Sequence, residues 1–142
     1  MLLRRLAMSL VLILVCCASM QAQNSEKMLK EVAEKFVKAA DIQDAGMLEE
    51  VLHPESQQFV SMGPRLIKSP ADQYIAAIKA KKLGGEPRTI TFKNIDFIGD
   101  NTALTVLNAK SSKFDFSYQL SMAKSEGKWM IVGILTEAKP LN

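Results

Sequence analysis

The side chains that could carry out acid–base or metal chemistry are few in this 142-residue chain. His53 is the only histidine, so neither a histidine-based metal cluster nor catalysis by a histidine pair is available. His53 directly precedes Pro54, and a residue before proline is pushed out of the helical region, which favours a structural role at a helix end. Asp96 lies beside a predicted β-bulge. An enzyme would have to rely on Asp96 and His53, and no general base with an evident partner is visible.

Aromatic residues with a polar group form the second set of candidates. Tyr74, Tyr118 and Trp129 each combine a large ring with an O–H or N–H that needs a partner when it is buried. Phe116 shares a strand face with Tyr118. Most aromatic side chains simply fill a core. If the domain keeps an open cavity, however, we expect these four residues to contact a ligand there.

Recognisable cofactor motifs are missing from the sequence. There is no glycine-rich phosphate loop, no Walker or Rossmann pattern, no Gly-x-Ser-x-Gly elbow and no internal repeat. We therefore expect no cofactor and no metal. Function has to be argued from the fold and from the aromatic residues.

The N-terminal segment has the parts of a secretory signal peptide. Arg4 and Arg5 precede an apolar run, and small residues follow near Ala22. We predict a signal peptide over residues 1–22, with cleavage after Ala18 as the alternative. The apolar run is shorter than a membrane-spanning helix normally requires, which disfavours an uncleaved anchor. Cys16 and Cys17 lack the preceding small residue that a lipoprotein cleavage site needs, so lipidation is disfavoured as well.

Cleavage would leave residues 23–142 as a single exported domain, periplasmic or secreted. Both cysteines would be removed, and with them any disulfide or thiol chemistry. Loss of the two arginines lowers the count of Lys and Arg from 18 to 16 against 15 acidic residues, so the net charge falls from +3 to +1. Such a balance gives no electrostatic reason to expect nucleic acid or a membrane as partner.

The apolar pattern of the mature chain changes its period once. Over residues 25–40 apolar side chains recur every three or four positions, which predicts an amphipathic helix. A shorter helix is predicted over 44–52, capped by Asp44, and a short strand over 57–62. A third helix is expected to begin with Ser69 as its cap and Pro70 as its first residue, and to end at Gly84-Gly85.

After Pro87 the period drops to two, which is typical of strands. Four strands are predicted, over 89–98, 101–109, 113–124 and 128–136, and their short polar connections indicate an antiparallel meander. The apolar phase slips near Lys93-Asn94, which predicts a bulge that bends the sheet. The last strand is apolar on both faces, so we expect a second subunit to cover the back of the sheet in a homodimer.

These elements predict an α+β domain with helices packed on a curved antiparallel sheet. Their order, the Leu-Glu-Glu-Val-Leu-His-Pro-Glu stretch at 48–55 and the Glu-Gly-Lys-Trp-Met-Ile-Val stretch at 126–132 resemble the nuclear transport factor 2-like (NTF2-like) superfamily. The resemblance is closest to the small bacterial branch labelled lumazine-binding or SnoaL-like. It implies a cone-like fold with a pocket between helices and sheet, and frequent dimers, but no particular activity.

Two functional hypotheses follow. The first is a non-catalytic exported protein that binds a small, largely apolar ligand in the cone or pairs with a protein partner. The alternative is a cyclase-like or isomerase-like enzyme, of the SnoaL or ketosteroid isomerase type, in which Asp96 or His53 would face inward beside Tyr74 or Tyr118.

Overall fold

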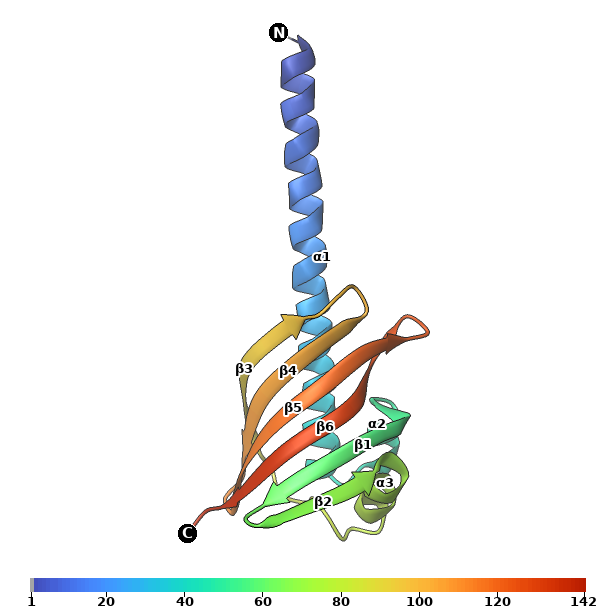
Figure 1. The fold of residues 1–142 in the computed structure, drawn as a ribbon, viewed down its shortest axis with the longest axis vertical. Coiled ribbons are helices and arrows are strands. Elements are labelled where there is room, and N and C mark those ends of the chain that lie inside the picture. The colour runs from blue at the N-terminus through green and yellow to red at the C-terminus, as the bar shows by residue number, and fades with distance from the viewer. Residues whose placement is uncertain (1) are drawn as a thin grey trace.

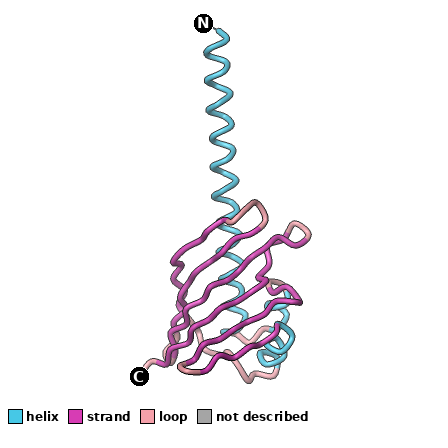
Figure 2. The backbone as a smooth tube through the Cα atoms, in the orientation of Figure 1, coloured by secondary structure: helices cyan, strands magenta, loops and turns pink. Residues whose placement is uncertain are grey.

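A curved sheet crossed on one face by a long helix forms the body of the protein (Figures 1 and 2). The computed structural model describes the backbone of residues 2–142 and the side chains of residues 17–142. Three helices and six strands follow one another in the order α1 (Leu2–Asp41), α2 (Ala45–Glu49), β1 (Leu52–Met62), β2 (Arg65–Pro70), α3 (Ala71–Lys79), β3 (Thr89–Phe97), β4 (Thr102–Lys110), β5 (Phe114–Ser125) and β6 (Lys128–Pro140).

The predicted helix over 25–40 forms the C-terminal part of α1, which runs without a break from Leu2. The N-terminal part of α1 projects beyond the sheet (Figure 1), and among the described side chains of α1, from residue 17 onward, the first buried one is that of Leu29. Packing against the sheet therefore begins well after the predicted signal peptide. Within the described part of the chain, no helix is long and apolar enough to cross a membrane.

The second and third helices are shorter than their sequence patterns suggested. Asp44 caps α2 as predicted, because its carboxylate accepts a hydrogen bond of 3.0 Å from the backbone N–H of Met47. The predicted start of the third helix is wrong by one residue. Pro70 is the N-cap of α3 and makes no capping hydrogen bond through its side chain, while Ser69 belongs to the strand before it.

The sheet has the strand order β2-β1-β6-β5-β4-β3. The predicted antiparallel meander is confirmed for β3 to β6, and the register shift between Phe92 and Asn94 confirms the predicted bulge. The sheet as a whole is mixed, however, because β1 pairs with β6 in parallel. Strand β2 was not predicted. It forms a β-hairpin with β1 through Gly63, whose φ of 57° lies in the left-handed region.

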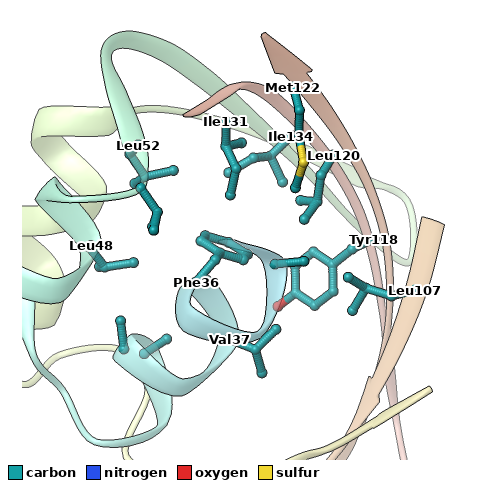
Figure 3. Close-up of a cluster of buried hydrophobic side chains, with 14 of the residues drawn as sticks. Phe36, Val37, Leu48, Leu52, Leu107, Tyr118, Leu120, Met122, Ile131 and Ile134 are labelled. Atoms are coloured by element: carbon teal, nitrogen blue, oxygen red, sulfur yellow. The ribbon is translucent and has the colours of Figure 1, made fainter. Parts of the chain in front are cut away.

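Phe36 of α1 lies at the centre of the core, with its ring among side chains from the inner face of the sheet (Figure 3). The inner face carries alternate residues of each strand, such as Leu120 and Met122 on β5. The core around Phe36 contains side chains from all three helices and from β1, β4, β5 and β6. The sheet is thus closed on its concave side wherever α1 lies across it.

Beyond Asp41, α1 no longer covers the sheet, and the connection between α3 and β3 takes its place. This connection is held against the end of α1. The N–H of Gly85 donates to the carbonyl oxygen of Ala40 at 3.0 Å, and the side-chain amide of Gln43 donates to the carbonyl oxygen of Leu83 at 3.0 Å. A Cβ at Gly84 would lie 2.1 Å from the Ala40 oxygen, so only glycine permits this approach.

Candidate functional site

A cavity of about 510 Å³ opens at this end of the cone. The inner faces of β1, β2, β5 and β6 form its wall, and α3 and the connection before β3 form its cover. Most of the lining surface is apolar. The lining side chains include Val60, Met62, Ile67, Tyr74, Leu83, Phe114, Phe116 and Tyr118. A cavity of this size and character is suited to a small organic molecule.

The aromatic wall of the cavity follows from the alternation of β5. Phe114, Phe116 and Tyr118 are separated by two positions each and therefore face the same side. Their rings form a ladder, with centroids 5.6 Å apart for the first pair and 5.9 Å apart for the second. Such spacing is typical of favourable contacts between aromatic rings. The wall thus offers a continuous apolar surface to a flat ligand.

A buried ion pair lies beside this wall. The Nε of Arg88 donates to Asp41 at 2.6 Å, and the backbone N–H of Arg88 donates to the same carboxylate at 3.0 Å. The two remaining guanidinium nitrogens donate to the hydroxyl of Tyr118 at 2.6 Å and to the carbonyl oxygen of Val37 at 2.9 Å. The guanidinium also lies over the ring of Phe116, 5.2 Å from its centroid. Arg88 therefore joins α1, the connection and β5.

The ionisation of the cavity residues follows from their burial. Burial raises the pKa of Tyr74 well above its usual value, and it raises the pKa of Tyr118 as well, although the nearby Arg88 charge acts in the opposite direction. Burial opposes the charge of Arg88, but the neighbouring Tyr118 and Asp41 outweigh it, so the pKa of Arg88 lies above its usual range. Near neutral pH the cavity wall thus carries two neutral phenols and a compensated ion pair.

Charged residues are gathered at the mouth of the cavity. Lys113 and Glu86 form an ion pair of 2.5 Å, which raises the pKa of the lysine and lowers that of the glutamate. Lys82 also lines the cavity and is exposed, as are the apolar side chains of Ile67 and Leu83. The mouth is therefore wet and charged at its border, while the interior is largely apolar.

Two polar atoms in the cavity wall have no hydrogen-bond partner. They are the side-chain oxygens of Gln58 on β1 and Thr136 on β6. Both residues are more than nine-tenths buried. An unpaired buried polar atom is unfavourable in a folded protein and calls for an explanation.

The structure brings together three of the four predicted ligand contacts. Tyr74, Phe116 and Tyr118 line the cavity. Trp129 does not line it. Its side chain is buried near the other end of β6, against Phe97 and below the ammonium group of Lys124. Trp129 was predicted from its indole N–H alone, and the last strand, being apolar on both faces, carries no pattern that indicates its position along the cone.

Neither conditional catalytic residue lines the cavity. Asp96 is exposed and pairs with Leu104, which lies on the outer face of β4. Asp96 therefore faces the convex side of the sheet, where its carboxylate accepts a hydrogen bond from Asn94. His53 lies at the start of β1, and its Nδ1 accepts from the N–H of Glu55 at 3.2 Å. Among residues 17–142 no cluster of three or more His, Cys, Asp or Glu side chains could hold a metal ion.

The residues that sequence reasoning missed are Arg88, Asp41, Gln58 and Thr136. Arg88 and Asp41 are separated by 47 positions, and nothing in the sequence around either residue distinguishes it from an exposed charged residue beside a turn. Thr136 gave no signal, because alternation from Trp129 and Ile131 places it on the outer face, and it faces inward only through the register shift opposite Ser121 and Met122. Gln58 gave no signal, since it lies within a mixed polar stretch.

Comparisons with known proteins agree with this geometry. A family model described as "Putative lumazine-binding" matches residues 24–134. No curated protein matches the chain in sequence. Among solved structures, an NTF2-like protein of unknown function from Silicibacter pomeroyi is similar at 16% identity with a TM-score of 0.74, covering 83% of this chain and 98% of its own.

Two further structures extend the comparison. An NTF2-like protein of unknown function from Shewanella baltica is similar at 19% identity with a TM-score of 0.72, covering 83% of this chain and 96% of its own. A hexachlorocyclohexane dehydrochlorinase is similar at 10% identity with a TM-score of 0.65, covering 87% and 93%. These likenesses establish a shared fold, and the same fold carries both an enzyme and proteins of unknown function.

Proposed function

Because this chain belongs to the "Putative lumazine-binding" family and has an NTF2-like fold, we propose that it is a non-catalytic binding protein that holds a small, largely apolar molecule in its cone. The open cavity of about 510 Å³ with its ladder of aromatic rings carries this proposal. Tyr74, Phe116 and Tyr118 are the proposed ligand contacts. Flat apolar molecules gain affinity from such surfaces through burial of their rings.

A cyclase-like or isomerase-like activity has less support from the geometry. It would need an acid or base free to reach a ligand in the cavity. Asp96 and His53 lie elsewhere, Glu86 is paired with Lys113 at the mouth, and Asp41 is paired with Arg88. The likeness to the dehydrochlorinase concerns the fold alone. A binding role uses the features of the cavity without requiring such a group.

Native mass spectrometry of the protein purified from its own host tests the proposal, because it reports subunit number and retained ligand together. We expect the wild-type protein to carry a small molecule that Ser69→Trp loses, since Ser69 lines the cavity and an indole there would fill it. Asn101→Trp is the control, because Asn101 is exposed in the turn between β3 and β4 and lines neither the cavity nor the apolar patch of the convex face. A wild-type protein without ligand and unable to bind any apolar probe would contradict the proposal.

A homodimer through the convex face of the sheet is a second part of the proposal. Phe59 and Leu135 are exposed and lie opposite each other on β1 and β6, facing outward. Val132 extends the same apolar patch along β6. Contiguous exposed apolar side chains on a sheet face favour burial against a partner, and a second copy of this chain is the partner we propose.

The oligomeric state in solution tests the dimer. Leu135→Glu should convert a dimer into a monomer in analytical ultracentrifugation, because it would bury a charge in the interface. Ile98→Glu is the control, since Ile98 is equally apolar and exposed but lies in the turn after β3. A wild-type monomer at micromolar concentration would argue against the dimer while leaving the ligand proposal intact.

Export is the third part of the proposal, with cleavage after Ala22 leaving a periplasmic or secreted domain. Residues 17–24 of α1 are exposed, and among the described side chains burial begins at Leu29, so cleavage would remove none of the described side chains that pack in the core. N-terminal sequencing of the protein from its host tests this directly, and Gln23 is the expected first residue. A chain that retains Met1, or that stays in the cytoplasmic fraction, would refute it.

A further inference from the structure

The unpaired polar atoms of the protein are not scattered evenly. Four buried side-chain atoms lack a hydrogen-bond partner within residues 17–142, and they belong to Gln57, Gln58, Trp129 and Thr136. Two of the four, the oxygens of Gln58 and Thr136, belong to side chains that line the one cavity described above. A buried oxygen without a partner destabilises the folded protein. Its retention in a cavity wall suggests that a ligand supplies the missing partner.

Strand register explains why these atoms share one surface. Tyr118 of β5 pairs with Thr136 of β6, and Gln58 of β1 pairs with Ser69 of β2. Val60 of β1 pairs with Thr136, and Gln58 lies two residues before Val60, so the side chains of Gln58 and Thr136 face the same side of the sheet. Ser69, Gln58, Thr136 and Tyr118 thus form a polar stripe across four strands, and all four line the cavity. The aromatic ladder continues from the Tyr118 end of the stripe.

The polar stripe has hydrogen-bonding capacity but no charge of its own. A glutamine amide can present a donor or an acceptor, and a threonine hydroxyl can act as either. The nearest buried charge, on Arg88, is already paired with Asp41, and its guanidinium nitrogens already donate to Asp41, Tyr118 and Val37. A ligand carboxylate at this depth would lose its water without gaining a free positive partner. Neutral groups suffer no such loss.

We propose that the polar stripe is a recognition subsite for a neutral ligand that carries a hydrogen-bond donor beside an acceptor on a flat ring, as a lactam does. The inference rests on the proposed binding function and specifies its ligand class. The flat ring lies along Phe114 and Phe116, and its donor and acceptor pair with Gln58 and Thr136. Lys82 and Lys113 line the same cavity but are exposed to solvent, where water screens their charges, so they offer little to a carboxylate buried at the stripe.

Three bicyclic probes of similar size test the inference by NMR titration of the full domain. Carbostyril has a lactam with donor and acceptor, N-methylcarbostyril lacks the donor, and naphthoate carries a negative charge. We expect carbostyril to bind about fivefold to tenfold more tightly than either of the others, which corresponds to one buried hydrogen bond.

Two variants connect this preference to the stripe. Gln58→Leu should weaken carbostyril binding by about fivefold and leave N-methylcarbostyril, which has no donor to lose, within about twofold, whereas Thr136→Val should weaken both by about fivefold because both keep the carbonyl acceptor. Thr105→Val is the matched control, because Thr105 is equally buried on the inner face of β4 but lies outside the cavity and bonds to the sulfur of Met122. Thr136→Val should also raise the melting temperature of the ligand-free protein by a few degrees, because it removes an unpaired buried hydroxyl.

The possible results separate the inference from the function on which it rests. If all three probes bind alike, or if Thr136→Val and Gln58→Leu leave carbostyril binding unchanged, the inference is overturned and the binding function stands. If no probe binds and Ser69→Trp changes nothing in native mass spectrometry, the binding function fails and the inference falls with it. A higher melting temperature of Thr136→Val together with weaker carbostyril binding supports both.

Discussion

The two ends of the cone use the same strands and the same alternation, yet one end is packed and the other is hollow. At the packed end, formed by Leu29, Ala33, Leu120, Met122, Trp129 and Ile131, every side chain is almost fully buried. At the open end, Phe114 and Phe116 continue the same face of β5 and are only half-buried. Both ends present large apolar residues, so side-chain type does not explain the difference.

The two ends differ in the segment that covers the concave face of the sheet. Over the packed end lies α1, whose side chains reach into the sheet. Over the open end, α1 has stopped at Asp41, and a connection held by Gly84 and Arg88 replaces it. A single backbone segment carries less apolar volume than a helix. The position at which α1 ends, Asp41, therefore determines where the cavity begins.

The largest expected effect contrasts two residues on the same face of β5. Leu120→Ala should lower the free energy of unfolding by about 4 kcal/mol, because Leu120 is fully buried and its loss leaves a void. Phe114→Ala should cost only about 1 kcal/mol, although it removes a larger side chain, because it borders an existing cavity. Urea unfolding of both variants measures the two losses in free energy of unfolding, and equal losses would contradict the difference between the two ends.

A somewhat smaller effect is expected at the border between the ends. Asp41→Asn should cost about 3 kcal/mol in urea unfolding, because it leaves the buried Arg88 charge without its partner. Glu50→Gln is the control. It breaks a pair with Lys35 that is exposed to solvent, and it should cost less than about 1 kcal/mol. Similar losses for the two variants would mean that the Arg88 pair does not hold the cover of the cavity.

The cover itself is tested by two glycines with nearly the same backbone conformation. Gly84 and Gly127 have φ values of 76° and 77°. A Cβ at Gly84 would collide with the Ala40 oxygen, whereas a Cβ at Gly127 would meet nothing within 4 Å. We expect Gly84→Ala to cost about 2 kcal/mol and Gly127→Ala about 1 kcal/mol by thermal unfolding. If Gly127→Ala were the more damaging, the close contact with α1 would not be what positions the connection.

The smallest effect concerns alkaline pH. The pKa values of Tyr74 and Tyr118 are raised in the folded state, so the folded protein keeps these protons where the unfolded chain loses them. Stability should therefore be complete below about pH 10 and fall above it by up to about 1.4 kcal/mol per pH unit for each tyrosine. Because the chain has two tyrosines, phenolate absorbance during titration reports on these alone. Tyr74→Phe should reduce the slope, and an unchanged slope would refute this assignment.

Sequence periodicity was sufficient for most of the architecture. The amphipathic pattern over 25–40, the bulge near Asn94 and the meander from Thr89 onward are all present, because each depends on local repetition of side chains. Strand β2 could not be found in this way. Its side chains from Arg65 to Lys68 are all exposed, so an edge strand of this kind carries no alternating pattern.

The site was predictable only in part, for a related reason. Alternation placed Phe116 and Tyr118 on one face of their strand, but it carries no information about position along the cone. Trp129 and Thr136 share one strand face only because of the register shift opposite Ser121 and Met122, and they lie about 23 Å apart at the usual rise per residue. The Arg88 pair and the stripe through Gln58 depend on contacts between distant segments, and the parallel pairing of β1 with β6 that creates them leaves no local trace.

That parallel pairing also sets the order in which the cavity can be made. Strand β6 follows the other five strands in the chain and lies between β1 and β5 in the sheet. During synthesis, or during passage through a membrane from the N-terminus, the wall that contains Gln58 therefore stays incomplete until β6 has emerged. Such late, long-range pairing slows folding. If the chain is exported as proposed, it arrives at its destination empty and meets its ligand only there.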